Sequence, residues 1–292
     1  MSSPLFIAAW RADTAPTELH SASVPAATAT SRAGLERVEI RIHLNAMSHP
    51  YLVDHNIAGT PVVPVAIVLD WFTAAARAWL PEPAPAVIRR LSVLRKIGLD
   101  RYANGGHPLT VRGIRDDAQL HLDLLGDGDS KHYHATASLA ASATPVEWTV
   151  PIDLKPVPPD VYDGRVLFHG PMFQVIREVQ GVSAAGAAAV LTGAADMGWN
   201  HAAWHIDPAA IDGGLQVAVL WARQVLGCAT LPMAVTECRT YQPGLYDSPT
   251  RCIVRARDVW PGGAECDIAF LGEDGTVRAE LFRVSLVPRP GG

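Results

Sequence analysis

Hydrophobic and polar residues alternate along much of this chain, and two long apolar stretches interrupt the alternation. Between Val38 and Leu44 apolar and polar residues take turns, which is typical of a half-buried strand. The stretch from Val62 to Leu80 is almost wholly apolar and rich in alanine, and it is too long for one strand. Because a helix that is apolar nearly all round belongs in a core, we expect a long buried helix here, with Pro64 in its first turn.

The same order of elements recurs in the second half of the chain. Strand-like runs separated by turn-forming residues follow the first helix, at 87–97, 109–114, 120–125 and 132–139. A second long apolar helix is expected at 212–226. Strand-like runs lie before and after it, at 178–182, 187–191, 231–239, 251–258, 264–271 and 277–287. The pattern therefore predicts a sheet wrapped around one buried helix, twice over, without a repeat at the level of residues.

Local composition divides the chain into four segments. Residues 1–34 are rich in Ala, Ser and Thr, which predicts a flexible leader. Four prolines within 151–160 predict a linker. We therefore expect one strand–helix–strand unit at 35–150 and a second one at 161–288.

The overall composition argues against several classes of function. Hydrophobic residues make up 49% of the 292 positions and charged residues 18%, which is enough for a large core. The net charge of −5, with no stripe of Lys and Arg, argues against nucleic-acid binding. No apolar run is long enough to span a bilayer. The four cysteines form no CxxC pair, so we expect reduced core thiols in a cytoplasmic protein and no zinc site.

Two short segments each carry one residue suited to proton transfer. His55 precedes the first helix, where Gly59 permits a tight turn and Pro64 stiffens the chain. Asp212 opens the second helix, and Gln216, one turn later, shares its face. A histidine and a carboxyl group that meet in an apolar tunnel can remove one proton and donate another.

Each of these residues also has an ordinary structural interpretation. His55 can simply be bonded to backbone near a turn, and Asp212 can be the N-terminal aspartate of a helix. The helix terminus would lower the pKa of Asp212 and burial would raise it, so the sequence leaves the direction open.

Both segments resemble motifs of the dehydratase domains of polyketide and fatty-acid synthases. His55, Gly59 and Pro64 occupy the three fixed positions of the HxxxGxxxxP motif of that family. Asp212 and Gln216 match its DxxxQ/H motif. Among these dehydratases, those of the polyunsaturated-fatty-acid type are the most similar.

Two further segments, in the same order along the chain, resemble the YGPxFQ and LP-aromatic motifs of the family. They supply the expected walls of a substrate tunnel: His169, Gly170, Pro171, Phe173, Leu231 and Pro232. His169 departs from the motif, which has tyrosine at this position, and Met233 stands where the family has an aromatic residue. These departures concern the shape of the substrate more than the chemistry.

The resemblance implies an α+β double hotdog fold, in which two antiparallel sheets are each wrapped around a long buried helix. It implies a hydro-lyase that removes water from a 3-hydroxyacyl thioester to give a 2-enoyl thioester. In this hypothesis His55 is the base, Asp212 the acid, and Gln216 holds Asp212. A backbone N–H at the start of the first helix, near Gly59 or Thr60, would polarise the thioester carbonyl.

The resemblance also implies partners and leaves alternatives open. An acyl carrier protein would deliver the substrate on phosphopantetheine, other synthase domains or subunits would work beside the chain, and a homodimer is compatible with the family. No metal or redox cofactor is expected. Double-bond isomerisation, cyclisation, thioester hydrolysis and non-catalytic acyl binding remain alternatives, and the chain can be a stand-alone protein or a module of a longer synthase.

Overall fold

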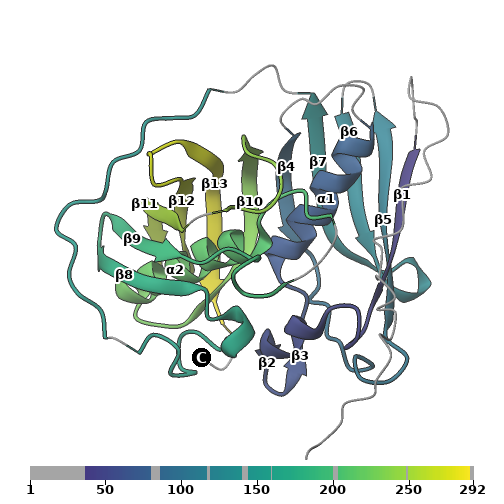
Figure 1. The fold of residues 1–292 in the computed structure, drawn as a ribbon, viewed down its shortest axis with the longest axis horizontal. Coiled ribbons are helices and arrows are strands. Elements are labelled where there is room, and N and C mark those ends of the chain that lie inside the picture. Colours follow the sequence, from purple (N-terminus) through teal and green to yellow (C-terminus); the bar gives the residue numbers. More distant parts are fainter. Residues whose placement is uncertain are drawn as a thin grey trace, which may run out of the picture.

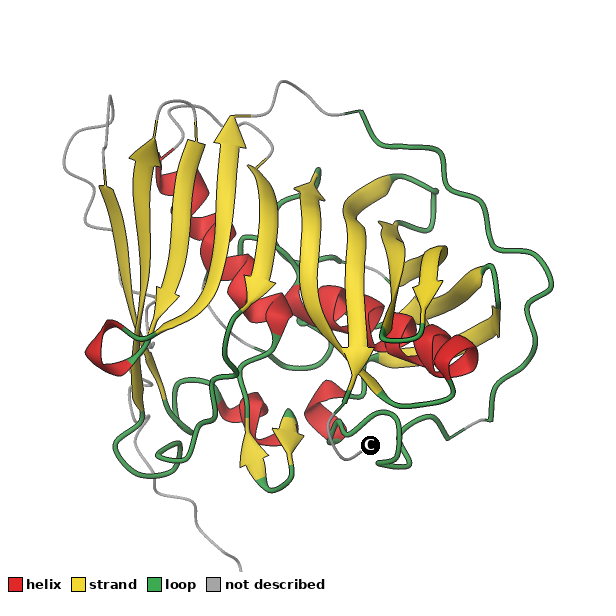
Figure 2. Cartoon of the chain, turned by 180° about the vertical axis from the view of Figure 1, so that it is seen from behind, coloured by secondary structure: helices red, strands yellow, loops and turns green. Residues whose placement is uncertain are grey.

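Two α-helices and the strands around them make up most of the part of the chain that the structure describes. The computed structural model describes residues 37–79, 86–116, 119–139, 144–158, 160–199, 203–247 and 249–289, so the leader predicted at 1–34 lies outside the described residues. Helix α1 (Val65–Trp79) lies in one half and helix α2 (Pro208–Leu226) in the other, and strands wrap around each (Figure 1, Figure 2). The strand–helix–strand pattern therefore occurs twice, as predicted.

The strands that surround α1 come from the first half of the chain: β1 (Arg37–Leu44), β4 (Ala86–Val93), β5 (His107–Asp116), β6 (Gln119–Leu125) and β7 (Lys131–Leu139). Those around α2 come from the second half: β8 (Ile176–Ser183), β9 (Gly186–Leu191), β10 (Thr230–Thr240), β11 (Thr250–Trp260), β12 (Gly263–Leu271) and β13 (Val277–Pro288). All eleven join one antiparallel sheet, ordered β1-β5-β6-β7-β4-β10-β13-β12-β11-β9-β8. Pairing of β4 with β10 makes the two expected sheets continuous.

Helix α1 begins three residues later than the sequence predicts. Val62 pairs with Gly98, and the N–H of Val63 donates to the carbonyl of Ile97, so both residues are tied into extended structure. Pro64 directly precedes the helix, and its carbonyl accepts from the N–H groups of Ile67 and Val68. The expectation that Pro64 lies in the first turn is therefore wrong by one position.

Helix α2 begins four residues earlier than predicted, at Pro208. Asp207 caps it, since its side chain accepts from the N–H of Ala210 at 3.0 Å, and Pro208 needs no N–H partner at the first position. Asp212 therefore lies in the second turn, and the interpretation of Asp212 as the N-terminal aspartate of the helix is wrong.

One apolar cluster runs through both halves and fixes the two helices. Twelve of the fifteen residues of α1 are buried, as expected for a helix that is apolar nearly all round. Along β1 every second residue is buried, which follows the alternation in its sequence. Each buried Val, Leu or Ile side chain stabilises the fold by about 1.5–3 kcal/mol, so the helix positions are strongly determined.

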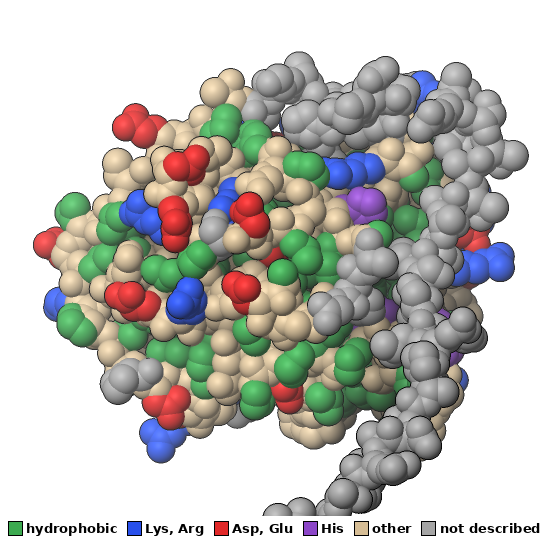
Figure 3. All heavy atoms as spheres, in the orientation of Figure 1, with side chains coloured by type: hydrophobic (Ala, Val, Ile, Leu, Met, Phe, Trp, Pro, Cys, Tyr) green, Lys and Arg blue, Asp and Glu red, His purple; other side chains and the backbone are tan. Residues whose placement is uncertain are grey.

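The surface carries charges of both signs. On the face shown in Figure 3, acidic and basic side chains of the described residues are interspersed among apolar ones, over the half that holds α2. Neither α1 nor α2 is long and apolar enough to cross a membrane, and the same holds for every helix in the described part of the chain.

Candidate active site

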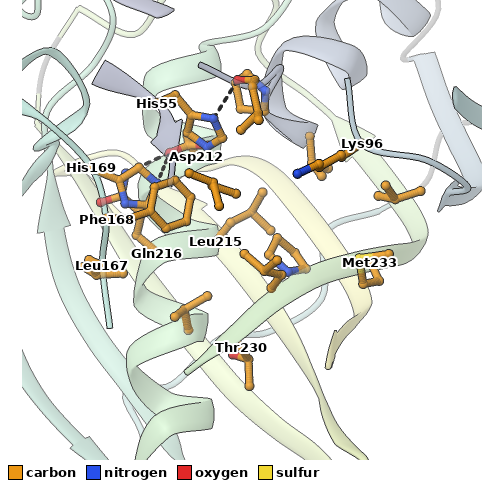
Figure 4. Close-up of a pocket in the computed structure, with 18 of the residues that line it drawn as sticks. His55, Lys96, Leu167, Phe168, His169, Asp212, Leu215, Gln216, Thr230 and Met233 are labelled. Carbon is orange, nitrogen blue, oxygen red and sulfur yellow. Dashed lines mark hydrogen bonds and ion pairs between the residues drawn. The ribbon is translucent and has the colours of Figure 1, made fainter. Parts of the chain in front are cut away.

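A pocket opens between the two halves, beside the start of α1 and the second turn of α2. Both halves contribute to its walls. Figure 4 shows His55, His169, Asp212 and Gln216 gathered on one side, with Lys96 and Met233 on the other. Most of the remaining lining is apolar, so the two imidazoles, the carboxyl group and the amide gather at one place, across the pocket from Lys96.

His55 is held by a small hairpin of two short strands, β2 (Asn56–Ile57) and β3 (Thr60–Pro61). Ala58 and Gly59 form the two-residue turn with φ of 53° and 86°, so the tight turn expected at Gly59 is present. The hairpin brings Val62 back beside His55, whose Nδ1–H donates to the Val62 carbonyl at 2.8 Å. That bond leaves the lone pair on Nε2 free to act on a ligand.

Burial sets the protonation state of His55, which is 7% exposed. Desolvation lowers its pKa to about 4, against the opposing effect of the hydrogen bond to Val62. His55 is therefore neutral at neutral pH, which is the form that accepts a proton. The structural interpretation, a bond to backbone near a turn, and the functional one both hold, because the two ring nitrogens serve different purposes.

The same hairpin corrects an expectation about the thioester carbonyl. Gly59 and Thr60 lie at the tip and second strand of the hairpin, several residues before α1 begins, and neither lines the pocket. A β-hairpin and a stretch of extended chain intervene before the helix. Pro64 and Val65 line the pocket at the helix start instead.

Asp212 is held on α2 by a chain of hydrogen bonds. The Nε2 amide of Gln216 donates to Asp212 Oδ2 at 2.8 Å and to the carbonyl of Phe173 at 2.9 Å. Tyr162 in turn donates its hydroxyl proton to Gln216 Oε1 at 2.8 Å, and that hydroxyl accepts from the N–H of Ile176. These bonds fix which way the Gln216 amide faces, so Asp212 receives a donor.

The pKa direction that the sequence leaves open is settled by burial. Asp212 is 4% exposed, and desolvation raises its pKa to about 7, outweighing the opposite effect of the Gln216 hydrogen bond. The carboxyl group therefore retains a proton over a wider pH range than an exposed aspartate.

His169 approaches Asp212 from the second half of the chain. Its Nε2 lies 3.7 Å from Asp212 Oδ2, and its ring stacks on Phe168 with 4.3 Å between centroids. The ring centroid of His55 is 5.2 Å away. Burial lowers the pKa of His169 well below its ordinary value, with a further contribution from His55.

Asp54 connects the segment that holds His55 with the segment that holds His169. It ends the 3₁₀ turn η1 (Pro50–Asp54), and its carbonyl accepts from the N–H of Gly170 at 2.8 Å, while its carboxylate accepts from that of Met172 at 2.7 Å. A Cβ added at Gly170 would lie 2.5 Å from Asp54 Oδ1, so only glycine fits this approach. Asp54 thereby anchors the segment that carries His169 next to His55.

The other predicted tunnel residues divide into two groups. Leu231 and Pro232, from β10, line the pocket together with His169. Gly170 is not among the lining residues, and Pro171 and Phe173 form the 3₁₀ turn η3 (Pro171–Phe173) behind it. Phe173 is fully buried with its ring 5.0 Å from that of His55, so it supports the site from outside the pocket.

Sequence reasoning missed three residues of the site. Tyr162 follows a proline-rich segment and has no motif that points to it. Asp54 directly precedes His55, and this adjacency is a signal that could have been used. Lys96 also lines the pocket, as a single lysine after a strand.

Metal ligation is possible at one place in the described residues. His55, His169 and Asp212 form the group of three in which one donor atom of each lies within 4.8 Å of the others. The cysteines are free, and Cys238, Cys252 and Cys266 are buried in three different strands, as expected for core thiols.

Comparisons with known proteins agree along most of the chain. A family model described as "Polyketide synthase dehydratase N-terminal domain" matches residues 145–290, and one described as "Polyketide synthase dehydratase domain" matches residues 26–113. A polyunsaturated fatty acid synthase polypeptide of Thraustochytrium sp. is 25% identical over 248 residues, 78% of this chain and 9% of that protein. A phenolphthiocerol/phthiocerol polyketide synthase polypeptide of Mycobacterium tuberculosis is 27% identical over 262 residues, 81% of this chain and 14% of that protein. The chain thus spans about a tenth of the length of these relatives.

Solved structures show the same fold. The dehydratase domain of a mycocerosic acid synthase-like polyketide synthase aligns with a TM-score of 0.74 at 18% identity, covering 94% of this chain and 98% of that one. The dehydratase domain from the CurJ module of the curacin polyketide synthase aligns with a TM-score of 0.71 at 14% identity, covering 91% and 97%. The double hotdog fold expected from the sequence is confirmed. With a family model on half of the chain and a second on its N-terminal part, this protein belongs to the polyketide synthase dehydratase family.

Proposed function

We propose that this chain removes water from a 3-hydroxyacyl thioester to give a 2-enoyl thioester. Membership of the family supports a dehydratase role in general. The observation that carries the specific reaction is the meeting of His55 and Asp212, from opposite halves of the chain, at one end of an apolar pocket. Elimination of water needs a base at C2 and an acid at the C3 oxygen, and the two side chains supply both.

In the proposed reaction Nε2 of His55 takes the proton from C2. The electron pair of that C–H bond forms the C2–C3 double bond, and the C3–O bond breaks. Asp212 gives its proton to the departing hydroxyl, which leaves as water. The bond from His55 Nδ1–H to Val62 keeps the basic nitrogen turned toward the substrate, and Gln216 steadies the carboxylate that forms.

The pocket suits this chemistry in two further ways. Apolar side chains such as Leu215, Val219, Leu231 and Met233 line it, which favours an acyl chain over a charged substrate. They also exclude water, so the neutral base and the protonated acid are the preferred forms. At the start of α1, beside Val65, the first N–H groups of the helix have no acceptor within the helix and offer donors to the thioester carbonyl.

We also propose the setting of the reaction. The substrate arrives on the phosphopantetheine of an acyl carrier protein, and other synthase domains or subunits act before and after it in polyketide or fatty-acid biosynthesis in the cytoplasm. Relatives that are parts of long synthases support the partnership with other domains. A homodimer remains compatible with the family. The reaction is redox-neutral, so it needs no redox cofactor.

The test is incubation of the protein with a racemic 3-hydroxyacyl pantetheine thioester, followed by mass spectrometry. Wild type should lose one water from the substrate, whereas His55→Ala and Asp212→Asn should not. His134→Gln, which changes a histidine on β7 away from the pocket, is the matched control and should react like wild type. Addition of water to the enoyl thioester would support the proposal equally, because the reaction is reversible.

Other products would redirect the proposal. A shifted double bond or a ring would favour isomerisation or cyclisation, and free acid with thiol would favour hydrolysis. Absence of any product in either direction, over several chain lengths, would favour an acyl-binding domain and contradict the proposed reaction.

A further inference from the structure

We propose that His55, His169 and Asp212 form a binding site for Zn²⁺, and that bound zinc blocks the acid–base reaction. The inhibition rests on the proposed function, whereas the binding of zinc does not. The proposal starts from the cluster itself, in which two imidazoles and one carboxyl group from three separate segments are buried together.

The spacing of the ligand atoms is close to what zinc requires. Bonds of about 2.0–2.2 Å in a tetrahedral site place neighbouring ligand atoms about 3.4 Å apart. His169 Nε2 and Asp212 Oδ2 are already 3.7 Å apart, and no pair of the three chosen atoms exceeds 4.8 Å.

Groups behind the cluster orient two of the three ligands. His55 donates Nδ1–H to the Val62 carbonyl, which is the arrangement by which metal-binding histidines commonly present Nε2. Gln216 donates to Asp212 Oδ2 and is itself held by Tyr162. A ligating carboxylate with such a partner is typical of zinc sites.

His169 brings an independent indication. It is 8% exposed, and its Nδ1 is buried without a hydrogen-bond partner among the described residues. No acceptor in the described part of the chain therefore holds the ring through Nδ1, and Nε2 is the nitrogen that lies next to Asp212. Burial also favours neutral imidazoles, which is the state that binds zinc.

The fourth coordination position of the zinc ion would face the pocket. Three protein ligands with one open coordination site are the arrangement of zinc sites that exchange ligands with solvent. Here the open side faces the cavity lined by Phe168 and Leu215. A metal at this position takes up the lone pair of His55 Nε2 and the carboxylate of Asp212, so zinc and the proposed substrate exclude one another.

The departure of His169 from the motif it resembles gives a sharp test. Tyrosine at this position would leave only His55 and Asp212 as strong ligands, so His169→Tyr should lose the site. Zinc is titrated into the metal-free protein and followed by isothermal titration calorimetry. We expect one Zn²⁺ per chain in wild type, with affinity reduced at least about 100-fold in His169→Tyr and Asp212→Asn, since loss of even a group that only orients a ligand costs about 10–100-fold.

His134→Gln is the matched control for adventitious binding. His134 bonds Asp123 at 2.7 Å and stacks near His121, so it is a histidine with a carboxylate beside it but without a third ligand among the described residues. Its loss should leave zinc affinity unchanged. Thermal unfolding of each variant without metal checks that the variants are folded.

The outcomes separate binding from catalysis. Equal zinc affinity in wild type and His169→Tyr, or no binding by wild type, would overturn the site. If the wild type binds zinc as expected and also dehydrates thioesters, added Zn²⁺ should abolish turnover, and a chelator should restore it. Unchanged turnover while zinc is bound would overturn the proposed inhibition. A protein that binds zinc in this way but converts no thioester would support the metal site and contradict the proposed function.

Discussion

Two buried aspartates, one on each helix, share a raised pKa and differ in what surrounds them. Burial raises the pKa of Asp70 on α1 and of Asp212 on α2 to about 7 in each case. Asp70 Oδ1 accepts from the N–H groups of His205 at 2.7 Å and Ile206 at 3.1 Å, in the segment that leads into α2. Among the described residues, Asp212 has a single side-chain donor, Gln216, and it faces the pocket.

The comparison shows that a raised pKa reports burial and does not by itself identify a catalytic acid. Both carboxyl groups are desolvated by an apolar helix, which makes the charged form unfavourable. Asp70 accepts hydrogen bonds from backbone N–H groups and thereby ties the two halves together. Asp212 keeps a carboxyl oxygen available beside the pocket. Access to a ligand, and not the pKa, separates the structural residue from the chemical one.

The largest expected contrast is in activity. Asp212→Asn removes the proposed acid while keeping the shape of the side chain, so dehydration should fall by about 10²–10⁴-fold. Asp70→Asn should keep activity within a few-fold, because an amide oxygen still accepts from His205 and Ile206. Initial rates on one 3-hydroxyacyl thioester measure both. An equal loss in the two variants would mean that Asp70 acts on the chemistry and that the comparison fails.

The next effect concerns the raised pKa of Asp70, which should make stability depend on pH. Asp70 is mostly protonated in the folded state up to about pH 7, whereas in the unfolded chain it ionises near its ordinary value of 3.8. The folded state therefore holds more protons between these limits, and stability falls as pH rises from about 4 to 7, by up to about 4 kcal/mol. Above pH 7 both states are ionised and this contribution is constant.

Asp70→Asn should remove that slope, which makes the difference between the variant and wild type the quantity to measure. Arg77 on the same helix opposes the shift and Asp207 adds to it, so both must be kept unchanged. Urea unfolding at several pH values gives the free energies. Parallel curves for wild type and Asp70→Asn would show that Asp70 is ionised in the folded protein, contrary to the expected direction.

A smaller effect concerns the role of Asp70 as a link between the halves. Asp70→Ala leaves the N–H groups of His205 and Ile206 without their acceptor, and unfolding free energy should fall by about 2–4 kcal/mol. Asp70→Asn should restore most of it at low pH, where wild type is protonated. Chemical denaturation compares the three proteins. If alanine is tolerated as well as asparagine, water replaces the carboxyl group and the link is dispensable.

The sequence predicts the fold more completely than the site, and particular residues show why. Alternation along β1 and the apolar stretch of α1 are local signals, and both elements form where the pattern places them within a few residues. Asp207 before Pro208 is another local signal, a cap followed by a first-turn proline, and it marks the start of α2 four residues before the start predicted from the motif at Asp212.

Contacts within the site depend on distances that no local pattern encodes. Tyr162 meets Gln216 across 54 positions, and Asp54 binds Met172 across 118. His55 and Asp212 could be paired only through the resemblance to dehydratases, since their juxtaposition results from the packing of two halves. The pKa direction of Asp212 likewise required knowing its burial, because the helix start and desolvation have opposite effects.

The smallest effect tests how far the preparation of Asp212 extends from the pocket. Tyr162 does not line the pocket, yet its hydroxyl holds Gln216 Oε1 and accepts from Ile176. Tyr162→Phe keeps the ring and removes one hydrogen-bond link worth about 0.5–1.5 kcal/mol, so kcat should fall by about 2–10-fold while KM stays unchanged. Steady-state kinetics on one 3-hydroxyacyl thioester measure both constants.

The control for this effect is Tyr246→Phe, which also removes a buried tyrosine hydroxyl outside the pocket. That hydroxyl has no hydrogen-bond partner among the described residues, so kcat should not change. If Tyr162→Phe lowered the unfolding free energy without changing kcat, Tyr162 would support the fold and Gln216 would hold Asp212 unaided. A fall in kcat confined to Tyr162→Phe would show that the hydrogen bonds from Tyr162 through Gln216 position Asp212. Within the described residues Asp70 has no such chain, because its carboxyl group is bonded to backbone N–H groups.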